Sequence, residues 1–529
     1  MNIRLLKRPG LSSLLFVALM VGLLCWTYVP RWDTNDDIAM SMIAHGYGFA
    51  AYGSPNLVFS NVLWGYLVRA LPAVHGVPGY SIATILVLLT CGWAILYYLI
   101  RLGAGWGAGM LMVALLLVLP TLFPQFTYNA GLLSVAGVIG WMKYARLGGT
   151  MSLVFACLMV FLGFLVRHEE CLLVVLVSLP FFPWKALKEQ RSMQLAFLLL
   201  GAGIAVAALL DHWSYSGAEW QHFREINSAR IPFTDYGADP SLKQHPEIIA
   251  RHGYTQNDIS LLGDWFLVDT RIADPQAMNA MLEELSGSAM NRLSLQSGID
   301  SIKALWDIKL FPLLLACVLV FVLMPNRRVA WAWVLFLVAL FVMGILGRPG
   351  ILRIYVPVLS LLLVATFISG NAIQGVQRWV ALFVLAVACA GNFYTIRQYS
   401  LIGERRLQQV QEDVRGLPGR DVAIWGGWVF PFEIAYPVLA HDADFRKFRY
   451  YGLNAFTYAP FSVASAQQAS GLGMLERFRG ADGISIIATR GELGMLRMYC
   501  AEHMNGQLSG TMTARTSSYS IYQVRCMAG

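Results

Sequence analysis

The chain has 529 residues, of which 57% are hydrophobic and 13% are charged, and its formal net charge is +8. A soluble protein carries roughly 25% charged residues, so this composition excludes an ordinary soluble enzyme and indicates a lipid bilayer as the surroundings. The basic residues form no stripe with interleaved aromatic residues, which argues against nucleic acid as a partner.

Apolar runs recur from the N-terminus to about residue 395. A membrane-spanning helix needs roughly 20 apolar residues, and the run at 170–183 is short and contains Pro180 and Pro183. The total is therefore uncertain by one or two, and we predict a mainly α, polytopic transmembrane bundle of about 11 spans. The runs are 11–30, 79–100, 103–122, 127–145, 149–166, 170–183, 193–211, 306–325, 329–346, 351–370 and 377–395.

The basic residues predict the orientation of this bundle. Cytoplasmic loops carry an excess of Lys and Arg, and alternate loops here are basic. If the N-terminus is cytoplasmic, the segments 31–78, 212–303 and 396–529 are exported. The first apolar run lacks a small-residue cleavage site and is expected to be an uncleaved anchor, in a bacterial inner membrane. The basic residues on the cytoplasmic side are Arg4, Lys7, Arg8, Arg101, Lys143, Arg146, Lys185, Lys188, Arg191, Arg327, Arg328 and Arg378.

The exported segments differ in character. The aromatic residues of 31–78 favour helices lying in the membrane interface, whereas 212–303 is far longer than an ordinary connection and is expected to be functional. Within it, Thr255-Gln-Asn-Asp258 is typical of a helix cap. The sequence thus predicts a membrane domain over 1–395, including both outer loops, and an extracytoplasmic α/β domain over 396–529.

In this C-terminal domain a charged helix is expected over 404–415, followed by strands at 421–425, 483–489 and 519–525. The tail also holds Cys500 and Cys526, whereas the other six cysteines lie in apolar runs. An exported compartment would permit a disulfide between Cys500 and Cys526. Two free thiols are the alternative.

An acidic pair follows the first apolar run, in Thr34-Asn35-Asp36-Asp37. Adjacent carboxylates at the mouth of a membrane segment are costly to hold there and favour a functional role. A carboxylate at this surface could remove the proton from an attacking hydroxyl group. The structural alternative is a capping box, with Thr34 as the cap and Asp37 three residues later.

Two further charged clusters fall on the same side of the predicted bundle. One is Arg167-His168-Glu169-Glu170, and the other contains Arg348 and Arg353. Taking a sugar from a lipid phosphate requires cations, or a metal held by carboxylates, to neutralise the departing phosphate. Arginine suits phosphate because its planar fork gives two parallel hydrogen bonds. A self-neutralised helix end and snorkelling arginines are the structural alternatives.

With these features the chain resembles the GT-C superfamily of membrane glycosyltransferases, which use sugars linked to polyprenyl phosphates on the non-cytoplasmic face. The matching features are the pair Asp36-Asp37 in the first outer loop, the many spans and the exported C-terminal domain. The stretch Arg353-Ile-Tyr355-Val-Pro357 also resembles an Arg-x-Tyr-x-Pro-like segment common late in such enzymes. The superfamily pair is often Asp-Glu, so the Asp-Asp of this chain leaves the metal question open.

The resemblance implies roles for individual residues. Asp36 corresponds to the catalytic base and Asp37 to its acidic neighbour. A divalent cation, Mg²⁺ or Mn²⁺, is one option, held by Asp37 and Glu169, but no cofactor is firmly implied. The residues expected at the donor phosphate are Arg348, Arg353, Tyr355 and Arg167, and those expected at a second acidic site for a metal or the acceptor are Glu169, Glu170 and His168.

The predicted function is transfer of a sugar, with inversion, from a polyprenyl-phosphate donor to a glycan, lipid or protein acceptor of the cell envelope. Two alternatives remain at this stage. An O-antigen-type polymerase or ligase would rely on loop residues such as His222, Arg224 and Arg230. A flippase for lipid-linked sugars would place polar groups near mid-membrane.

Overall fold

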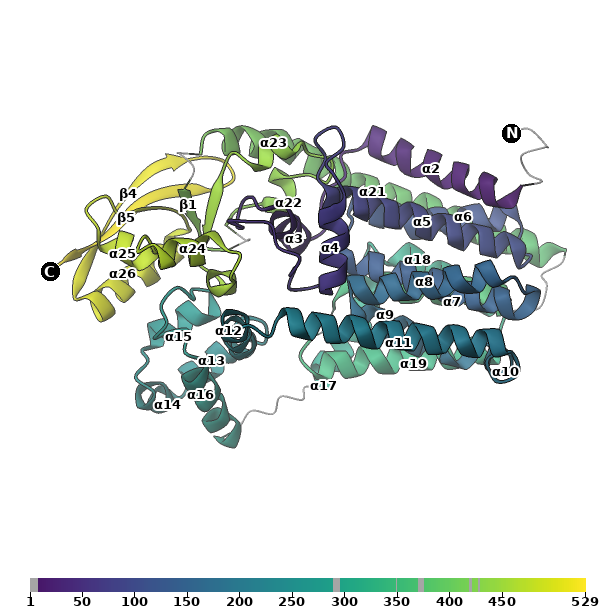
Figure 1. Cartoon of the computed structure of the whole chain (residues 1–529), viewed down its shortest axis with the longest axis horizontal. Helices are drawn as coiled ribbons and strands as arrows, with labels where there is room; N and C mark the ends of the chain where they lie inside the picture. The colour runs from purple at the N-terminus through teal and green to yellow at the C-terminus, as the bar shows by residue number, and fades with distance from the viewer. Residues whose placement is uncertain (1–7, 289–294, 349, 370–374, 418–420, 427–428) are drawn as a thin grey trace.

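The computed structural model describes residues 8–288, 295–348, 350–369, 375–417, 421–426 and 429–529. Its long helices lie side by side in a bundle, and short helices, loops and a sheet gather at one end of that bundle (Figure 1). We call this end the exported end, after the orientation that the sequence predicts for it, and the opposite one the far end. The basic residues Arg4 and Lys7 lie outside the described residues.

The helices of the bundle come from two stretches of the chain, residues 9–214 and 311–415, with the two helices of the first outer loop set apart from it. Its centre is α7, which is almost wholly buried. Glycines let its neighbours approach, since a Cβ on Gly131 would lie 2.3 Å from Pro357 and one on Gly140 would lie 2.6 Å from Ala156. Small residues at such crossings are typical of membrane helices. The helices are α2 (Pro9–Thr27), α5 (Gly79–Arg101), α6 (Trp106–Leu122), α7 (Phe126–Leu147), α8 (Thr150–Val166), α9 (His168–Ser178), α10 (Trp184–Glu189), α11 (Arg191–Ser214), α18 (Phe311–Leu323), α19 (Arg327–Ile345), α20 (Leu352–Ser369) and α21 (Val376–Arg415).

Six of the described helices are long and apolar enough to cross a membrane: α2, α5, α11, α19, α20 and α21. The count becomes seven if Leu295–Trp306 and Phe311–Leu323, which meet at 87°, form one broken span. Helices α6 and α8 are apolar but shorter. The chain is therefore an integral membrane protein, while the predicted number of about eleven spans is not confirmed by length and composition.

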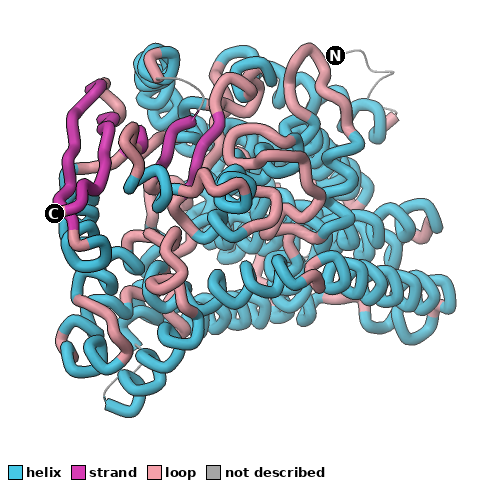
Figure 2. The backbone as a smooth tube through the Cα atoms, turned by 60° about the vertical axis from the view of Figure 1, so that its left-hand side comes forward, coloured by secondary structure: helices cyan, strands magenta, loops and turns pink. Residues whose placement is uncertain are grey.

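The exported part is built from short helices. The first outer loop contributes two, as its aromatic residues predicted, and the long loop after α11 contributes most of the others. Figure 2 shows that loops and turns separate these helices at the end that carries the sheet. They are α3 (Asn35–His45), α4 (Val62–Ala70), α12 (Ala218–Thr234), α13 (Ala238–Lys243), α14 (Pro246–Arg251), α15 (Gln256–Gly263), α16 (Pro275–Ser288), α17 (Leu295–Lys303), α22 (Phe432–Ala435), α23 (Asp442–Phe445), α24 (Val463–Ala469), α25 (Met474–Arg479) and α26 (Arg490–Met504).

The C-terminal region carries a five-stranded sheet in the order β2-β1-β3-β5-β4. Strand β1 pairs in parallel with β2 and β3, while β5 runs antiparallel to β3 and β4. The three predicted strands are confirmed as β1, β3 and β5, but the sequence analysis missed β2 and β4. The strands are β1 (Asp421–Ile424), β2 (Arg449–Gly452), β3 (Ile484–Ile487), β4 (Gly506–Arg515) and β5 (Ser520–Ala528).

One continuous helix joins the bundle to this sheet. Helix α21 has 40 residues, and it includes both the last predicted span and the charged stretch 404–415. It therefore runs without a break through residue 395, where the sequence analysis places the domain boundary. Buried Arg31 packs against it and donates to the carbonyl oxygens of Tyr399 and Ser400 at 3.2 and 3.3 Å.

A disulfide joins Cys500 of α26 to Cys526 of β5, with a Cα–Cα distance of 5.7 Å. It ties the last helix to the last strand. Of the two states that the sequence left open for these cysteines, the structure has the paired one.

Candidate functional site at the exported end of the bundle

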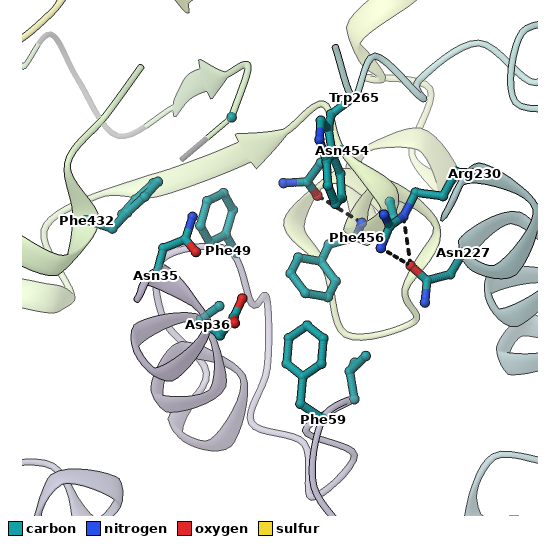
Figure 3. A pocket seen from close by; sticks show the side chains of 14 residues that line it. Asn35, Asp36, Phe49, Phe59, Asn227, Arg230, Trp265, Phe432, Asn454 and Phe456 are labelled. Atoms are coloured by element: carbon teal, nitrogen blue, oxygen red, sulfur yellow. Dashed lines mark hydrogen bonds between the residues drawn. The ribbon is translucent and has the colours of Figure 1, made fainter. Parts of the chain in front are cut away.

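A cavity of about 310 Å³ lies where the first outer loop, the long loop and the C-terminal region meet. Figure 3 shows Asn35 and Asp36 on one side of it and Trp265, Asn454 and Arg230 on the other. Five of its lining residues are aromatic and five are polar or charged, a mixture of apolar surface and placed polar groups that is typical of small-molecule sites. The lining residues are Asn35, Asp36, Ala39, Phe49, Val58, Phe59, Asn227, Arg230, Trp265, Gly426, Phe432, Asn454, Ala455 and Phe456.

The first outer loop is fastened to the C-terminal region beside this cavity. Tyr450 donates its backbone N–H to Gly48 at 3.0 Å, and Val463 donates to Phe49 at 2.8 Å. In the other direction, the backbone N–H of Ala51 reaches the carbonyl oxygen of Phe461 at 2.8 Å. These bonds fasten the loop to the C-terminal region, so Asp36 and the C-terminal residues that line the cavity are held in place around it.

Asp36 lies on the first turn of α3 and lines the cavity. Its Oδ2 is 3.4 Å from Nη1 of Arg353, in the first turn of α20, and both side chains are 30% exposed. Residues more than 300 positions apart in the chain thus form an ion pair at the exported end of the bundle. The structure brings these two predicted site residues together, with Asp36 between Arg353 and the cavity.

Asp37 has a different environment, although it is the next residue. Its side chain is fully buried, and its Oδ1 accepts hydrogen bonds from the Tyr80 hydroxyl at 2.9 Å and the Phe126 backbone N–H at 3.0 Å. Phe126 is the first residue of α7, so Asp37 caps that helix and joins α3 to α5 and α7. Burial raises the pKa of the Asp37 carboxyl well above its usual range.

The capping box at Thr34, which was the structural alternative for this segment, is not formed. Thr34 is the residue before α3, but its side chain makes no capping hydrogen bond, and the carboxylate of Asp37 binds Tyr80 and Phe126 instead. The corresponding prediction in the long loop is confirmed: Thr255 and Asp258 form a reciprocal capping box at the start of α15.

Two charged residues beside the ion pair were not among the predicted site residues. Asp33 accepts a hydrogen bond from the Tyr128 hydroxyl at 3.2 Å, and both Lys309 and Arg353 act on it electrostatically. Burial nevertheless raises the pKa of the Asp33 carboxyl above its ordinary value. Lys309 lies over the Tyr399 ring, 4.8 Å from its centroid. The site therefore has a second cation near Arg353, contributed by the turn before α18, which the sequence analysis did not single out.

The second predicted acidic cluster lies at the start of α9, and its two glutamates differ in exposure. Glu170 is 3% exposed and is close enough to Arg167 and Arg353 to interact with them electrostatically. The side chain of Glu169 is 55% exposed and lies 3.7 Å from Arg167 and 3.4 Å from His168. Arg353 thus connects the first and second acidic clusters through Asp36 and Glu170.

Arg167 itself packs against the bundle. Its guanidinium lies over the Phe126 ring, 5.0 Å from the centroid, and its side chain is 18% exposed. Arg167 does not line the cavity, but Phe126 also stacks on Phe59, a lining residue, at a centroid distance of 6.1 Å.

Two residues expected at the donor phosphate have other contacts. Arg348 is exposed, and its Nε donates to the Tyr236 hydroxyl at 2.8 Å. Tyr355 is 1% exposed, and its hydroxyl donates to the carbonyl oxygen of Ser301 at 2.9 Å. Neither residue lines the cavity. Of Arg348, Arg353 and Tyr355, the one that contacts Asp36 is Arg353.

We call the side of the cavity formed by the long loop and the C-terminal region the exported wall. Arg230, which is 8% exposed, contacts several other residues of this wall. Its guanidinium lies over the Trp265 ring, 4.0 Å from the centroid. The guanidinium donates twice to Oδ1 of Asn227, at 3.0 and 2.9 Å, and once each to Thr234 at 2.7 Å and Asp235 at 3.2 Å. These bonds occupy four of the five donors that an arginine offers, so Arg230 fixes the position of its neighbours.

Backbone strain is concentrated at this cavity. Trp265 has a φ of 64° and Val58 a φ of 71°, and both residues line it. Such values are rare outside glycine, and each costs on the order of 1–3 kcal/mol unless the surroundings enforce it. For Trp265 they do: the Trp425 indole donates to the carbonyl oxygen of Asp264 at 2.6 Å, and Leu267 donates its N–H to Leu453 at 2.8 Å.

The two proposed metal ligands differ in exposure, since Asp37 is fully buried and the side chain of Glu169 is 55% exposed. Within the described ranges, a group of three His, Asp or Glu side chains close enough to share an ion is found elsewhere, at Asp258, Glu502 and His503. These three already have partners, since His503 lies 2.8 Å from Asp258 and Thr255 donates to Glu502 at 3.0 Å. They join the long loop to α26, and we assign no reaction step to a metal.

The loop residues that would favour a polymerase or ligase are separated. His222 packs against the Tyr458 ring at a centroid distance of 5.4 Å. Arg224 lies over the Tyr215 ring at 4.5 Å. Of the three, Arg230 is the one that lines the cavity.

Comparison with known proteins gives a structural likeness only. No protein-family model and no curated protein matches the chain. Among solved structures, the chain is similar to ArnT from Cupriavidus metallidurans in the apo state, with a TM-score of 0.40 and 13% identity, covering 96% of this chain and 97% of that one. It is also similar to the same protein bound to undecaprenyl phosphate, with a TM-score of 0.38, 12% identity and the same coverage. A likeness of this strength does not assign a reaction to the chain, so its function has to be argued from the geometry of its own site.

Proposed function

We propose that the chain is a membrane glycosyltransferase that moves a sugar from a polyprenyl-phosphate donor to a cell-envelope acceptor on the non-cytoplasmic face. The observation that carries this proposal is the position of Asp36 between Arg353, at the end of the bundle, and an aromatic cavity in the exported layer. A lipid-linked sugar has its parts in the same order, with the tail in the bilayer, the phosphate at the surface and the sugar beyond it.

In the proposed reaction Asp36 is the general base. It accepts the proton of an acceptor hydroxyl while that oxygen attacks the anomeric carbon. The bond from this carbon to the phosphate oxygen breaks, the oxygen keeps the electron pair, and polyprenyl phosphate leaves with inversion at the sugar. Arg353 offers the phosphate a planar fork of donors. The phosphate would replace Asp36 as the partner of Arg353, which leaves the carboxylate available for the proton.

Lys309 supports the same assignment for the phosphate. Lys309 and Arg353 both act electrostatically on Asp33, and a second fixed cation would stabilise the charge that develops on the leaving group. Glu170, buried near Arg353, is the remaining candidate for an acceptor contact, while Glu169 and His168 lie at its exposed edge.

The proposed orientation places the far end of the bundle in the cytoplasm of a bacterial inner membrane and the sheet in the periplasm. Arg101 ends α5, Arg146 lies in the last turn of α7, and Arg191 and Arg327 begin α11 and α19. All four helix ends lie at the far end (Figure 1), as the excess of cationic residues in cytoplasmic loops requires. The disulfide in the C-terminal region supports an oxidising compartment there.

We further propose that the enzyme has two functional parts, a membrane domain over 1–395 and an extracytoplasmic α/β domain over 396–529. The first would hold the lipid and the base, and the second would close the cavity over the sugar. Because α21 runs through the boundary, the two parts are expected to act as one unit rather than as separable domains.

The experiment compares Asp36→Asn with wild type in purified full-length protein reconstituted in lipid. Labelled polyprenyl-phosphate sugars extracted from membranes serve as the donor. The assay measures both released polyprenyl phosphate and glycosylated product. Loss of a general base is expected to lower the rate about 10²–10⁴-fold with an unchanged thermal unfolding midpoint. If both Asp36→Asn and Asp36→Ala transfer sugar at the wild-type rate, Asp36 is not the general base.

A further inference from the structure

The charges that line the cavity are already neutralised by partners outside the lining. Asp36 is paired with Arg353, and Arg230 is paired with Asp235. Neither Arg353 nor Asp235 lines the cavity, and the rest of the lining consists of neutral side chains. While these two pairs are intact, a ligand that carried its own charge would gain no free counter-ion on entering the cavity and would lose its hydration.

Three asparagine side chains line the cavity: Asn35, Asn227 and Asn454. Oδ1 of Asn227 accepts two bonds from Arg230, and Oδ1 of Asn454 accepts the backbone N–H of Phe456 at 2.9 Å. These bonds use both lone pairs of the Asn227 oxygen and one of the Asn454 oxygen, so these two side chains offer a ligand mainly their NH₂ donors. Such donors suit the oxygens of hydroxyl groups.

The flat surfaces of the cavity are aromatic. Trp265, Phe456 and Phe59 lie around its centre in Figure 3. Trp265 is held by Arg230 on one face and by bonds from the C-terminal region on either side of it in the chain. An aromatic ring placed so rigidly offers contact area at little cost in conformational entropy.

Resting on the glycosyltransferase function proposed above, we propose that this cavity binds an uncharged sugar ring against Trp265, and that Arg230 is a positioning residue that holds Trp265 in place. The ring could belong to the donor or to the acceptor. An aromatic face, neutral amide donors and internally paired charges favour a neutral hexose or pentose over an amino sugar or a uronic acid. A volume of about 310 Å³ is at the small end of the ~300–1,000 Å³ typical of ligand sites, which fits one ring rather than an oligosaccharide.

The first test measures binding and does not need turnover. Saturation-transfer NMR on the full-length protein in nanodiscs would use methyl glucoside, galactoside, mannoside and arabinoside as neutral probes. Methyl glucuronide and methyl glucosaminide are the charged probes. At least one neutral glycoside is expected to bind tenfold or more tightly than both charged ones, and Trp265→Ala is expected to weaken that binding about tenfold. Trp213→Ala is the matched control, because this tryptophan is 74% exposed at the end of α11.

Two outcomes would overturn the proposal: a charged glycoside that binds as tightly as every neutral one, or Trp265→Ala binding that equals wild type. Both outcomes are distinguishable from failure of the proposed function. A protein that binds neutral sugar through Trp265 but transfers none would refute the glycosyltransferase and leave the sugar site intact. A protein that transfers sugar equally well without Trp265 would refute the sugar site and leave the glycosyltransferase function intact.

The second test addresses Arg230 and the source of the ring. Arg230→Lys keeps the charge but loses the fork, and Arg230→Met keeps the aliphatic stem. If Arg230 positions Trp265, both variants raise the KM of one substrate several-fold while kcat stays within about twofold of wild type. A higher KM for the donor assigns the ring to the donor, and a higher KM for the acceptor assigns it to the acceptor. A fall in kcat with both KM values unchanged would contradict the positioning role.

Discussion

The two walls of the cavity, one at the end of the bundle and the other the exported wall, differ in how their charged residues are bonded. The wall at the bundle carries charged residues in incomplete environments: Asp36 and Arg353 are each 30% exposed, at a long 3.4 Å separation. In the exported wall the charged group is enclosed by partners, since Arg230 makes four hydrogen bonds. Groups that must change partners during a reaction need spare capacity, whereas groups that define a shape are better fully bonded. The bundle wall is thus suited to chemistry and the exported wall to recognition.

The largest effect that would sharpen this contrast is expected at Arg353. Arg353→Ala removes the cation beside Asp36, and loss of such an electrostatic contact typically costs about 10²–10³-fold in kcat. Arg348→Ala is the matched control, since Arg348 is exposed and bonded to Tyr236, and it should stay within a few-fold of wild type. Steady-state transfer kinetics measure both variants. Equal losses would show that the phosphate contacts both arginines, and the emphasis on Arg353 would be wrong.

Asp37 should behave as a structural residue although it adjoins Asp36. Asp37→Ala leaves the Tyr80 hydroxyl and the Phe126 N–H unpaired in the interior, at a cost of about 1–3 kcal/mol for each group. Asp37→Asn keeps an acceptor oxygen, and because burial raises the Asp37 pKa well above its usual range, the neutral amide should be tolerated. Thermal unfolding in detergent checks the order of stability. An active site that needs a carboxylate at 37 would instead lose activity in the stable Asp37→Asn protein.

A third variant tests the helix that joins the two walls. In α21, a Cβ on Gly403 would lie 1.3 Å from the Arg31 guanidinium, so Gly403→Ala should displace Arg31 from the Tyr399 and Ser400 carbonyls. Overpacking of this kind typically costs about 1–3 kcal/mol. Gly391→Ala, in the same helix, would meet nothing closer than 3.9 Å and should be neutral or slightly stabilising. Identical unfolding midpoints for the two variants would mean that the contact between Arg31 and α21 contributes nothing to stability.

The smallest effect concerns pH and the exported wall. Burial, with a contribution from Glu492, raises the pKa of Asp264 to about 6. The folded state therefore binds a proton that the unfolded state has already lost, and stability falls as pH rises from about 4 to about 6. Asp264→Asn should flatten this part of the profile and leave the exported wall relatively more stable above pH 6. Unfolding midpoints measured every half pH unit would show whether the two proteins diverge in that window, and parallel profiles would rule out Asp264 as the cause.

Much of the architecture could be predicted from apolar runs. A membrane helix satisfies its own backbone hydrogen bonds and needs a long apolar segment, so its sequence is recognisable. Strands β1, β3 and β5 could be predicted for a similar reason, since each has a short apolar run. Strand β4 could not, because its residues are mostly exposed polar ones and it pairs only along the edge of β5. Its position depends on a partner that the sequence does not reveal.

The site was predictable at its charged wall and not at its exported wall. Asp36 and Arg353 stood out because charges beside apolar runs are rare. The same rule did not separate Asp36 from Asp37, since which of two neighbours faces inward depends on the orientation of α3 against Tyr80. Trp265 and Arg230 gave no local signal: an aromatic and a cation in a long polar loop are ordinary, and their pairing is set by bonds from Trp425 and Leu453.

The 40 residues of α21 make a rod of about 60 Å at 1.5 Å per residue, roughly twice the ~30 Å hydrocarbon thickness of a bilayer. About half of this helix therefore extends beyond the lipid. When a bilayer thins or thickens, helices tilt to match it, and tilt of this rod would move the C-terminal region, which contributes Phe432, Asn454 and Phe456 to the cavity. We therefore expect the shape of the cavity to respond to the thickness of the surrounding bilayer.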